Sequence, residues 1–170
     1  MEKKFKAEFV KDLQNKKITV RREFDASPEL VWKAWTESKL LDQWWAPKPW
    51  QAKTKVLTFK EGGNWLYAMC GPDGSMMWNL IEFSSITKNS SFKATASFTD
   101  ENGNKNPAFP TMYWKNDFVP TGIGTRVEVE IHFTSEKDFQ QIIAMGFEGG
   151  FSLGLENLDE LLAKYELQNS

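Results

Sequence analysis

The residue types that most often carry out covalent chemistry are scarce in this chain of 170 residues, which contains one histidine, His132, and one cysteine, Cys70. His132 alternates with the apolar residues of a strand-like segment, so its imidazole is expected on the polar, solvent-facing side of that strand. Cys70 lies at a strand end beside a turn and has no basic neighbour that would activate its thiol. We therefore expect neither residue to be catalytic, and we expect no metal and no cofactor.

Three polar residues are left as candidates for acid–base chemistry, namely Glu82, Glu148 and Tyr67. A carboxyl group that faces a cavity can act as a general acid or base. The spacing of the two glutamates does not show that they converge, so no catalytic residue is assigned. These residues define one alternative function, a cyclase-like, aromatase-like or hydrolase-like enzyme, which requires a cavity carboxylate with a raised pKa.

The charge and hydropathy patterns exclude several classes of partner. The chain has 21 Lys and Arg against 23 Asp and Glu, a formal net charge of −2, which offers no positive field for nucleic acid. No apolar run approaches the 18 residues of a membrane-spanning helix, and the N-terminal residues lack the hydrophobic region of a signal peptide. We therefore expect a cytoplasmic protein, a monomer or homodimer, that neither binds nucleic acid nor inserts into a membrane.

Aromatic residues are unusually frequent, with eight Trp, thirteen Phe and three Tyr, beside six Met. Large rings leave irregular space between them, so this composition is typical of an apolar pocket as well as of a core built from large residues. Five tryptophans fall within nineteen residues: Trp32, Trp35, Trp44, Trp45 and Trp50. We interpret most of them as core that covers an open end of the sheet, and a minority as a rim or lid over an aromatic ligand.

The hydrophobic periodicity predicts one α+β domain over residues 1–170. The expected elements are strands over residues 5–9 (within an N-terminal extension of residues 1–15) and 18–24, short helices that begin at Ser27-Pro28 and at Ser38, strands and turns between Trp50 and Thr134, and one long helix over residues 136–166. We expect the strands to form a curved antiparallel sheet that wraps around this long C-terminal helix.

Four glycines interrupt the predicted last helix: Gly146, Gly149, Gly150 and Gly154. Each costs about 1 kcal/mol relative to Ala inside a helix, so the missing side chains should serve a purpose. One purpose is close packing against bulky strand residues, and the other is room for a ligand between helix and sheet. Both can hold along one helix, and Gly149, which lies off the stripe formed by the other three, is the preferred cavity position.

Six sequence motifs occur in the order Phe24-Asp-Ala-Ser-Pro-Glu-Leu-Val-Trp-Lys-Ala-Trp-Thr36, Leu41-Asp-Gln-Trp-Trp-Ala-Pro47, Glu61-Gly-Gly-Asn-Trp-Leu-Tyr67, Gly71-Pro-Asp-Gly74, Phe98-Thr-Asp-Glu-Asn-Gly103 and Met145-Gly-Phe-Glu-Gly-Gly-Phe151. Together they resemble the homologues of the activator of the ninety-kilodalton heat-shock-protein ATPase, within the START-like, birch-pollen-allergen-like (SRPBCC) superfamily. The resemblance extends from about Ile18 to Tyr165. It implies a helix-grip fold with a cavity between the sheet and the C-terminal helix.

The resemblance also carries functional expectations. Superfamily members bind lipids, sterols, polyketides and flavonoid-like molecules, and some are cyclases or aromatases. A chaperone partner is a second alternative, in which the chain is an interaction module that regulates the chaperone ATPase and shows an exposed apolar patch rather than a deep cavity. The eukaryotic activator carries a separate N-terminal chaperone-binding domain for which this chain has no room, so we expect no stimulation of the chaperone.

We therefore predict that the chain binds a small hydrophobic or aromatic molecule in a central cavity and catalyses no covalent step. Strand alternation and the helix stripe predict the lining residues Trp65, Tyr67, Met69, Trp78, Leu80, Phe98, Trp114, Phe118, Ile142, Met145, Gly149 and Leu153. Glu82 and Glu148 are the candidate polar groups of this cavity.

Overall fold

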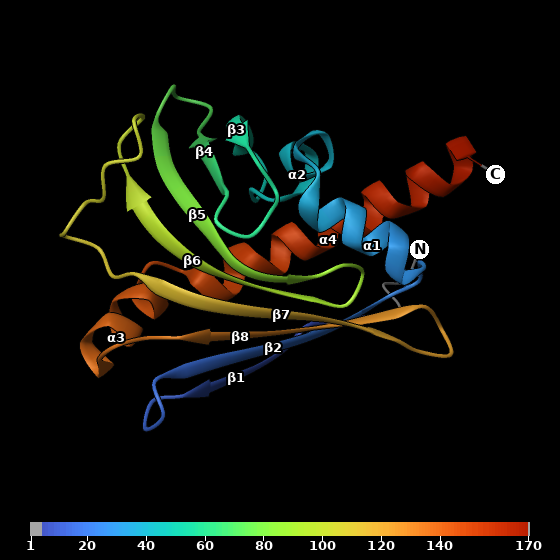
Figure 1. Ribbon diagram of the computed structural model, residues 1–170, viewed down its shortest axis with the longest axis horizontal. Coiled ribbons are helices and arrows are strands. Elements are labelled where there is room, and N and C mark those ends of the chain that lie inside the picture. Colours follow the sequence, from blue (N-terminus) through green and yellow to red (C-terminus); the bar gives the residue numbers. More distant parts are fainter. Residues whose placement is uncertain (1–4, 170) are drawn as a thin grey trace.

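A curved antiparallel sheet of eight strands wraps around the C-terminal helix in the computed structural model, which describes residues 5–169 (Figure 1). The strands are β1 (Glu8–Asp12), β2 (Lys17–Phe24), β3 (Gln51–Leu57), β4 (Asn64–Cys70), β5 (Met76–Thr87), β6 (Ser91–Thr99), β7 (Met112–Pro120) and β8 (Thr125–His132). The helices are α1 (Pro28–Thr36), α2 (Ser38–Trp44), α3 (Glu136–Ala144) and α4 (Phe147–Asn169). The strands lie in the order β1-β2-β8-β7-β6-β5-β4-β3. The predicted α+β helix-grip fold is confirmed.

The first two strands form an antiparallel hairpin, and the first begins later than predicted. β1 begins at Glu8 and pairs with β2 from Glu8↔Arg21 to Asp12↔Lys17, whereas the sequence pattern predicted a strand over residues 5–9. The turn between them sets this register, because Lys16 takes a positive φ of 53° and its N–H donates to Leu13 O.

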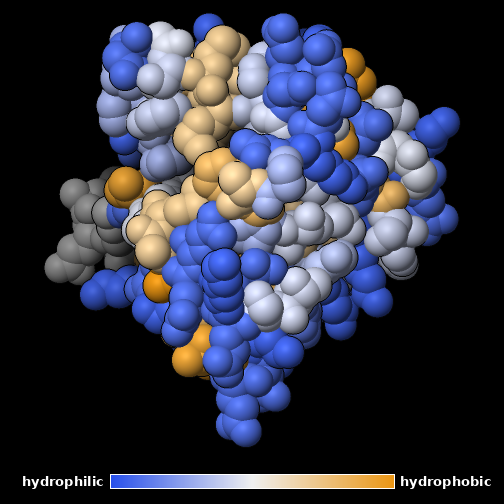
Figure 2. Space-filling model, turned by 90° about the vertical axis from the view of Figure 1, so that its left-hand side faces the viewer, coloured by the Kyte–Doolittle hydropathy of each residue, from blue (hydrophilic) through white to orange (hydrophobic). Residues whose placement is uncertain are grey.

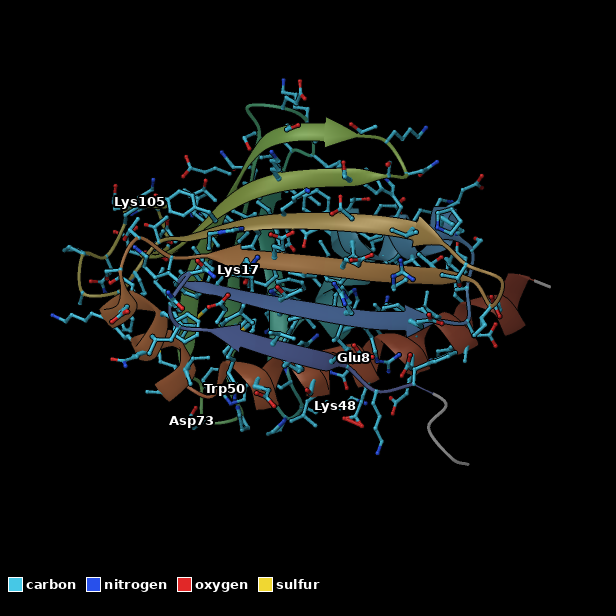
Figure 3. The ribbon with its side chains drawn as sticks, turned by 90° about the horizontal axis from the view of Figure 1, so that it is seen from below. Glu8, Lys17, Lys48, Trp50, Asp73 and Lys105 are labelled. Atoms are coloured by element: carbon cyan, nitrogen blue, oxygen red, sulfur yellow. The ribbon has the colours of Figure 1, made fainter. Side chains whose placement is uncertain are left out.

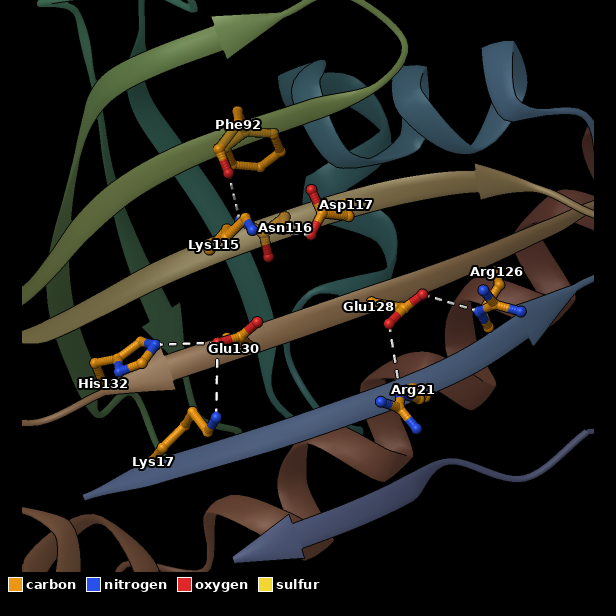
Figure 4. A network of polar contacts seen from close by, with 10 residues as sticks. All are labelled: Lys17, Arg21, Phe92, Lys115, Asn116, Asp117, Arg126, Glu128, Glu130 and His132. Atoms are coloured by element: carbon orange, nitrogen blue, oxygen red, sulfur yellow. Dashed lines mark hydrogen bonds and ion pairs between the residues drawn. The ribbon is translucent and has the colours of Figure 1, made fainter. Parts of the chain in front are cut away.

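Strand β8 shows why the sheet has two distinct faces. Its apolar residues Val127, Val129 and Ile131 are at most 1% exposed, against the core. Figure 4 shows the opposite face, on which Glu128 pairs with Arg21 and Arg126, and Glu130 pairs with Lys17 and His132. The side chain of His132 is 49% exposed, so the predicted solvent-facing position is confirmed.

Helices α1 and α2 close one end of the concave face. Ser27 caps α1 by accepting a hydrogen bond from Leu30 N, and Pro28 occupies the first turn, as the sequence predicted. The indole of Trp44 is fully buried and donates from Nε1 to Ala34 O at 2.8 Å, which joins α2 to α1. In Figure 1 both helices lie alongside α4.

The prediction of one long C-terminal helix over residues 136–166 is wrong in one respect, because the structure has two helices there. α3 ends at Ala144, and Gly146 takes a φ of +84° before α4 begins. A left-handed glycine just past the last helical residues is a common way to end a helix, since glycine has no Cβ to clash. Within residues 5–169, no helix is long and apolar enough to span a membrane.

A buried ion pair holds α4 against the sheet. Arg22 of β2 is 3% exposed, its guanidinium lies 4.8 Å from the centroid of the Phe24 ring, and its Nη2 donates to the carboxylate of Asp159 in α4. A charge removed from water in this way needs its partner. The ion pair therefore fixes the C-terminal half of α4 in place.

Candidate functional site

A cavity of about 320 Å³ lies between the concave face of the sheet and the junction of α3 with α4. It is lined by Trp45, Pro47, Trp50, Tyr67, Met69, Met77, Asn79, Phe98, Met112, Trp114, Ile142, Met145, Phe147, Gly150 and Phe151. None of these residues carries a formal charge, and most are aromatic residues or methionines. We name this space the main cavity.

The rings that border the main cavity pack against one another and against Trp65 in edge-to-face or tilted contacts. Trp45 lies at the centre, with its ring centroid 5.5 Å from that of Trp65, 6.0 Å from that of Trp114 and 6.1 Å from that of Phe151. Such offset and tilted arrangements are the favoured geometries of aromatic pairs. The inner wall of the cavity is therefore a rigid aromatic surface.

Two polar groups form one edge of this wall. Tyr67 of β4 lies opposite Asn79 of β5 in the sheet register. The Tyr67 hydroxyl accepts a hydrogen bond from Trp45 Nε1 at 2.8 Å. Burial raises the pKa of the Tyr67 phenol far above its ordinary value, against a smaller opposite effect of the Trp45 hydrogen bond, so the phenol keeps its proton at neutral pH. It can donate a hydrogen bond but cannot serve as a base.

The mouth of the main cavity is formed by flexible and partly exposed residues. Met77 is 38% exposed and Met145 43% exposed, and both line the cavity. Figure 2 views this end of the molecule and shows a band of hydrophobic surface between hydrophilic rims. Trp50 lies at the same end, beside the turn that contains Asp73 (Figure 3). Methionine adapts to ligands of different shape because its side chain is unbranched and polarizable.

Half of the predicted lining residues do border the main cavity. The six that do so are Tyr67, Met69, Phe98, Trp114, Ile142 and Met145. Trp65 instead stacks behind Tyr67 at 4.0 Å and lines a smaller, separate cavity. Phe118 lies deeper in the core, 5.1 Å from the ring of Trp32.

The predicted lining positions Trp78 and Leu80 are wrong, because they lie on the opposite face of β5. Asn79 is the inward residue, since it pairs with Tyr67 on one side and Phe98 on the other. Lys55 Nζ lies 5.9 Å from the Trp78 ring on the outer face. A Cβ built on Gly103 would lie 4.0 Å from Leu80 Cδ2, so the loop after β6 covers this outer apolar cluster.

Gly149 and Leu153 were also predicted to line the cavity, and both point away from it. Gly149 is exposed, a Cβ built on it would meet nothing within 4 Å, and Leu153 is 48% exposed. The break at Gly146 changes the rotation of α4 relative to a continuous helix, so Gly150 takes the cavity position. Gly154 serves close packing, because a Cβ there would lie 3.3 Å from Trp45 O.

The two candidate carboxylates lie outside the main cavity. Glu82 pairs with Lys105 at 3.0 Å and Glu148 pairs with Lys11 at 2.8 Å, and both glutamate side chains are about half exposed. Cys70 is partly buried at the end of β4. Among residues 5–169, no group of three or more His, Cys, Asp and Glu side chains is arranged to hold a metal ion.

Nine lining residues were not among those predicted: Trp45, Pro47, Trp50, Met77, Asn79, Met112, Phe147, Gly150 and Phe151. Trp45 and Trp50 belong to the tryptophan cluster of which a minority was expected to form a rim. Met112 follows from strand alternation, because it shares a face of β7 with Trp114. Pro47 lies in a loop, where sequence periodicity gives no orientation.

Residues 25–163 match the model of the family described as Activator of Hsp90 ATPase homolog 1-like protein. The crystal structure of protein Ms6760 from Mycobacterium smegmatis is similar, with 27% identity, a TM-score of 0.85 and coverage of 91% of this chain and 95% of that one. A protein from Arthrobacter aurescens, solved by NMR, has 28% identity and a TM-score of 0.87, with 92% and 91% covered. No curated protein matches the chain.

Proposed function

The chain belongs to the family of Activator of Hsp90 ATPase homolog 1-like proteins, and from this membership we propose that it binds one small apolar or aromatic molecule in the main cavity. Folds of this kind commonly bind hydrophobic ligands. The observation that carries the proposal is the cavity of about 320 Å³, whose fifteen lining residues include no charged side chain.

The size and lining of the main cavity support a particular class of ligand. Its volume is at the low end of the range for small-molecule sites, which favours a compact molecule of two or three rings. An ionised group would lose its hydration without a compensating charge, so the ligand is neutral. The Tyr67 hydroxyl and the Asn79 amide favour a ligand with one polar atom at that edge.

A hydrolase-like or cyclase-like mechanism finds little support in this cavity. Glu82 and Glu148 are paired with lysines on the surface, and the raised pKa of the buried Tyr67 phenol keeps it protonated, so it cannot act as a base. Binding without covalent chemistry is therefore the function that we favour over the enzymatic alternative.

Two adjacent glycines of α4 provide a matched test. Gly150 lines the main cavity, and a Cβ there would meet only Pro47 Cγ at 3.9 Å, whereas Gly149 faces open space. Leucine at position 150 should therefore fill the cavity, and leucine at position 149 should not. Both substitutions remove a helical glycine, so both variants are expected to fold.

The measurement is the fluorescence of N-phenyl-1-naphthylamine, an uncharged aromatic probe, titrated with each protein. We expect saturable binding to the wild type and to Gly149→Leu, and binding at least about tenfold weaker to Gly150→Leu. Equal affinities for the two variants, at unchanged melting temperatures, would contradict the proposal. Native mass spectrometry of the protein purified from cells then identifies any molecule that it retains.

A further inference from the structure

A second, smaller cavity of about 30 Å³ lies behind the aromatic wall of the main cavity. It is lined by Trp35, Trp45, Trp65, Ile81, Phe83, Phe92, Ala94, Trp114 and Asn116. Trp45 and Trp114 line both cavities, so they form the partition between them. We name this space the inner chamber.

Three buried polar atoms without a hydrogen-bond partner belong to residues that line the inner chamber: Trp35 Nε1, Trp114 Nε1 and Asn116 Oδ1. Trp35 is 4% exposed and Asn116 is 2% exposed. Within the described part of the chain one further buried side-chain atom is unpartnered, Ser97 Oγ, and it lies on the opposite face of β6 from Ala96. Buried polar atoms normally have hydrogen-bond partners, so three unpartnered atoms on residues around one small cavity require an explanation.

Asn116 occupies a position where strand alternation favours an apolar residue. Met112, Trp114 and Phe118 share its face of β7. Its amide Nδ2 donates to Phe92 O at 3.5 Å, a long hydrogen bond (Figure 4), and this leaves Oδ1 free. A leucine would fill nearly the same shape without a polar atom to satisfy. The asparagine therefore indicates a polar occupant of the chamber.

We propose that the inner chamber binds a single uncharged hydroxyl oxygen. A hydroxyl accepts two hydrogen bonds and donates one, which matches the two indole N–H donors and the one amide oxygen. A carbonyl oxygen would leave Asn116 Oδ1 without a donor. The chamber volume of about 30 Å³ is large enough for one water-sized oxygen.

The hydroxyl has two sources, a water molecule or the end of a ligand in the main cavity. The ring centroids of Trp45 and Trp114, which line both cavities, are 6.0 Å apart, so a hydroxyl of a ligand in the main cavity would enter the chamber between these rings. The ligand source rests on the proposed function, whereas the water source does not depend on it.

The experiment observes the indole N–H groups by NMR in the complete chain. Trp35→Phe and Trp114→Phe assign the two Nε1–H resonances, and nuclear Overhauser contacts to water are measured in the free protein. The measurement is repeated with 2-naphthol and with naphthalene, which differ by one hydroxyl. Contacts from both indoles to water that persist with either probe support a bound water.

Loss of the water contacts with 2-naphthol but not with naphthalene, together with an affinity about tenfold higher for 2-naphthol, supports the ligand as the source. If neither indole contacts water or responds to 2-naphthol, the proposal is overturned. Water contacts without binding of either probe leave the chamber intact and remove the proposed function. If both probes bind while neither indole contacts water or responds to 2-naphthol, the inner-chamber proposal fails and the proposed function stands.

A pair of variants makes the assignment specific. Asn116→Leu removes the acceptor at nearly constant shape, and it should abolish the water contacts of both indoles, or reduce the preference for 2-naphthol to below about twofold. Ser97→Ala removes the orphan hydroxyl on the outer face and should change neither signal. An unchanged pattern in a folded Asn116→Leu contradicts the proposal. If that variant does not fold, the wild-type contacts still decide.

Discussion

The two ends of the concave face are built from similar aromatic residues and differ in what closes them. At the packed end, α1 and α2 insert Val31, Leu41 and Trp44 against Phe24 and Leu158, and none of these five residues is more than 1% exposed. At the open end, four methionines and the rings around Trp45 leave a cavity of about 320 Å³. Aromatic content alone therefore does not distinguish a core from a pocket.

The difference lies in the backbone that covers each end. The Arg22–Asp159 ion pair holds α4 against β2, and the Asn157 amide of α4 donates to Trp44 O and Ala46 O at the end of α2. At the other end, Gly146 breaks the helix, and Gly150 presents no side chain to the sheet. At position 150 the rings of the open end therefore meet no opposing side chain, and space is left between helix and sheet. A pocket arises where the covering helix loses bulk and continuity.

The largest expected effect is the loss of a tryptophan from the packed end. Trp44→Ala removes a fully buried indole and its hydrogen bond to Ala34 O, which should destabilise the protein by about 3–5 kcal/mol. Trp50→Ala, at the partly buried rim of the open end, should cost less, about 1–2 kcal/mol. Urea unfolding of both variants measures the contrast. Comparable losses would mean that the two ends are packed alike.

The ion pair at the packed end should give the next largest effect. Asp159→Ala leaves Arg22 buried without its partner, and we expect a loss of about 2 kcal/mol, since Asp159 is itself partly exposed. The control is Glu160→Ala, which breaks an ion pair with Lys48 whose side chains are both about 70% exposed and should cost less than about 1 kcal/mol. Equal effects in chemical denaturation would show that α4 is not anchored there.

Two glycines of α4 should respond in opposite directions, by the smallest amounts. Gly149→Ala adds a methyl group where nothing lies within 4 Å, so it should stabilise the protein by up to about 1 kcal/mol through helix propensity. At Gly154 a Cβ would lie 3.3 Å from Trp45 O and 3.4 Å from Trp44 O. Gly154→Ala should therefore offset that gain or lower the melting temperature. A higher melting temperature of Gly154→Ala would contradict the close packing of α4 on α2.

The sequence predicted the packed regions better than the pocket, and the reason is physical. Strand β8 alternates cleanly because one face meets the core and the other meets water, so the positions of Val129 and His132 could be predicted. Strand β5 does not alternate in this way. Both of its faces are partly covered, the outer one by the loop that contains Gly103, and the phase of Trp78 was consequently misassigned.

The helix positions of the pocket were misplaced for a related reason. Periodicity continues across Gly146, since Ile142 and Phe151 are both buried, and a glycine within an apolar pattern does not reveal its φ. The left-handed turn there shifts the inward stripe from Gly149 to Gly150. Cavity residues depend on such local geometry, whereas the family motifs already specify the fold.

The methionine methyl groups test the central contrast between the two ends most directly. Met69, Met77, Met112 and Met145 line the main cavity, and Met76 is 52% exposed and lies outside it. In a titration of ¹³C-methyl-methionine protein with naphthalene, we predict saturable shifts of the four lining methyl groups and an unchanged Met76 resonance. Equal shifts of Met76, or no shift in any of the four, would contradict an aromatic-binding cavity at the open end.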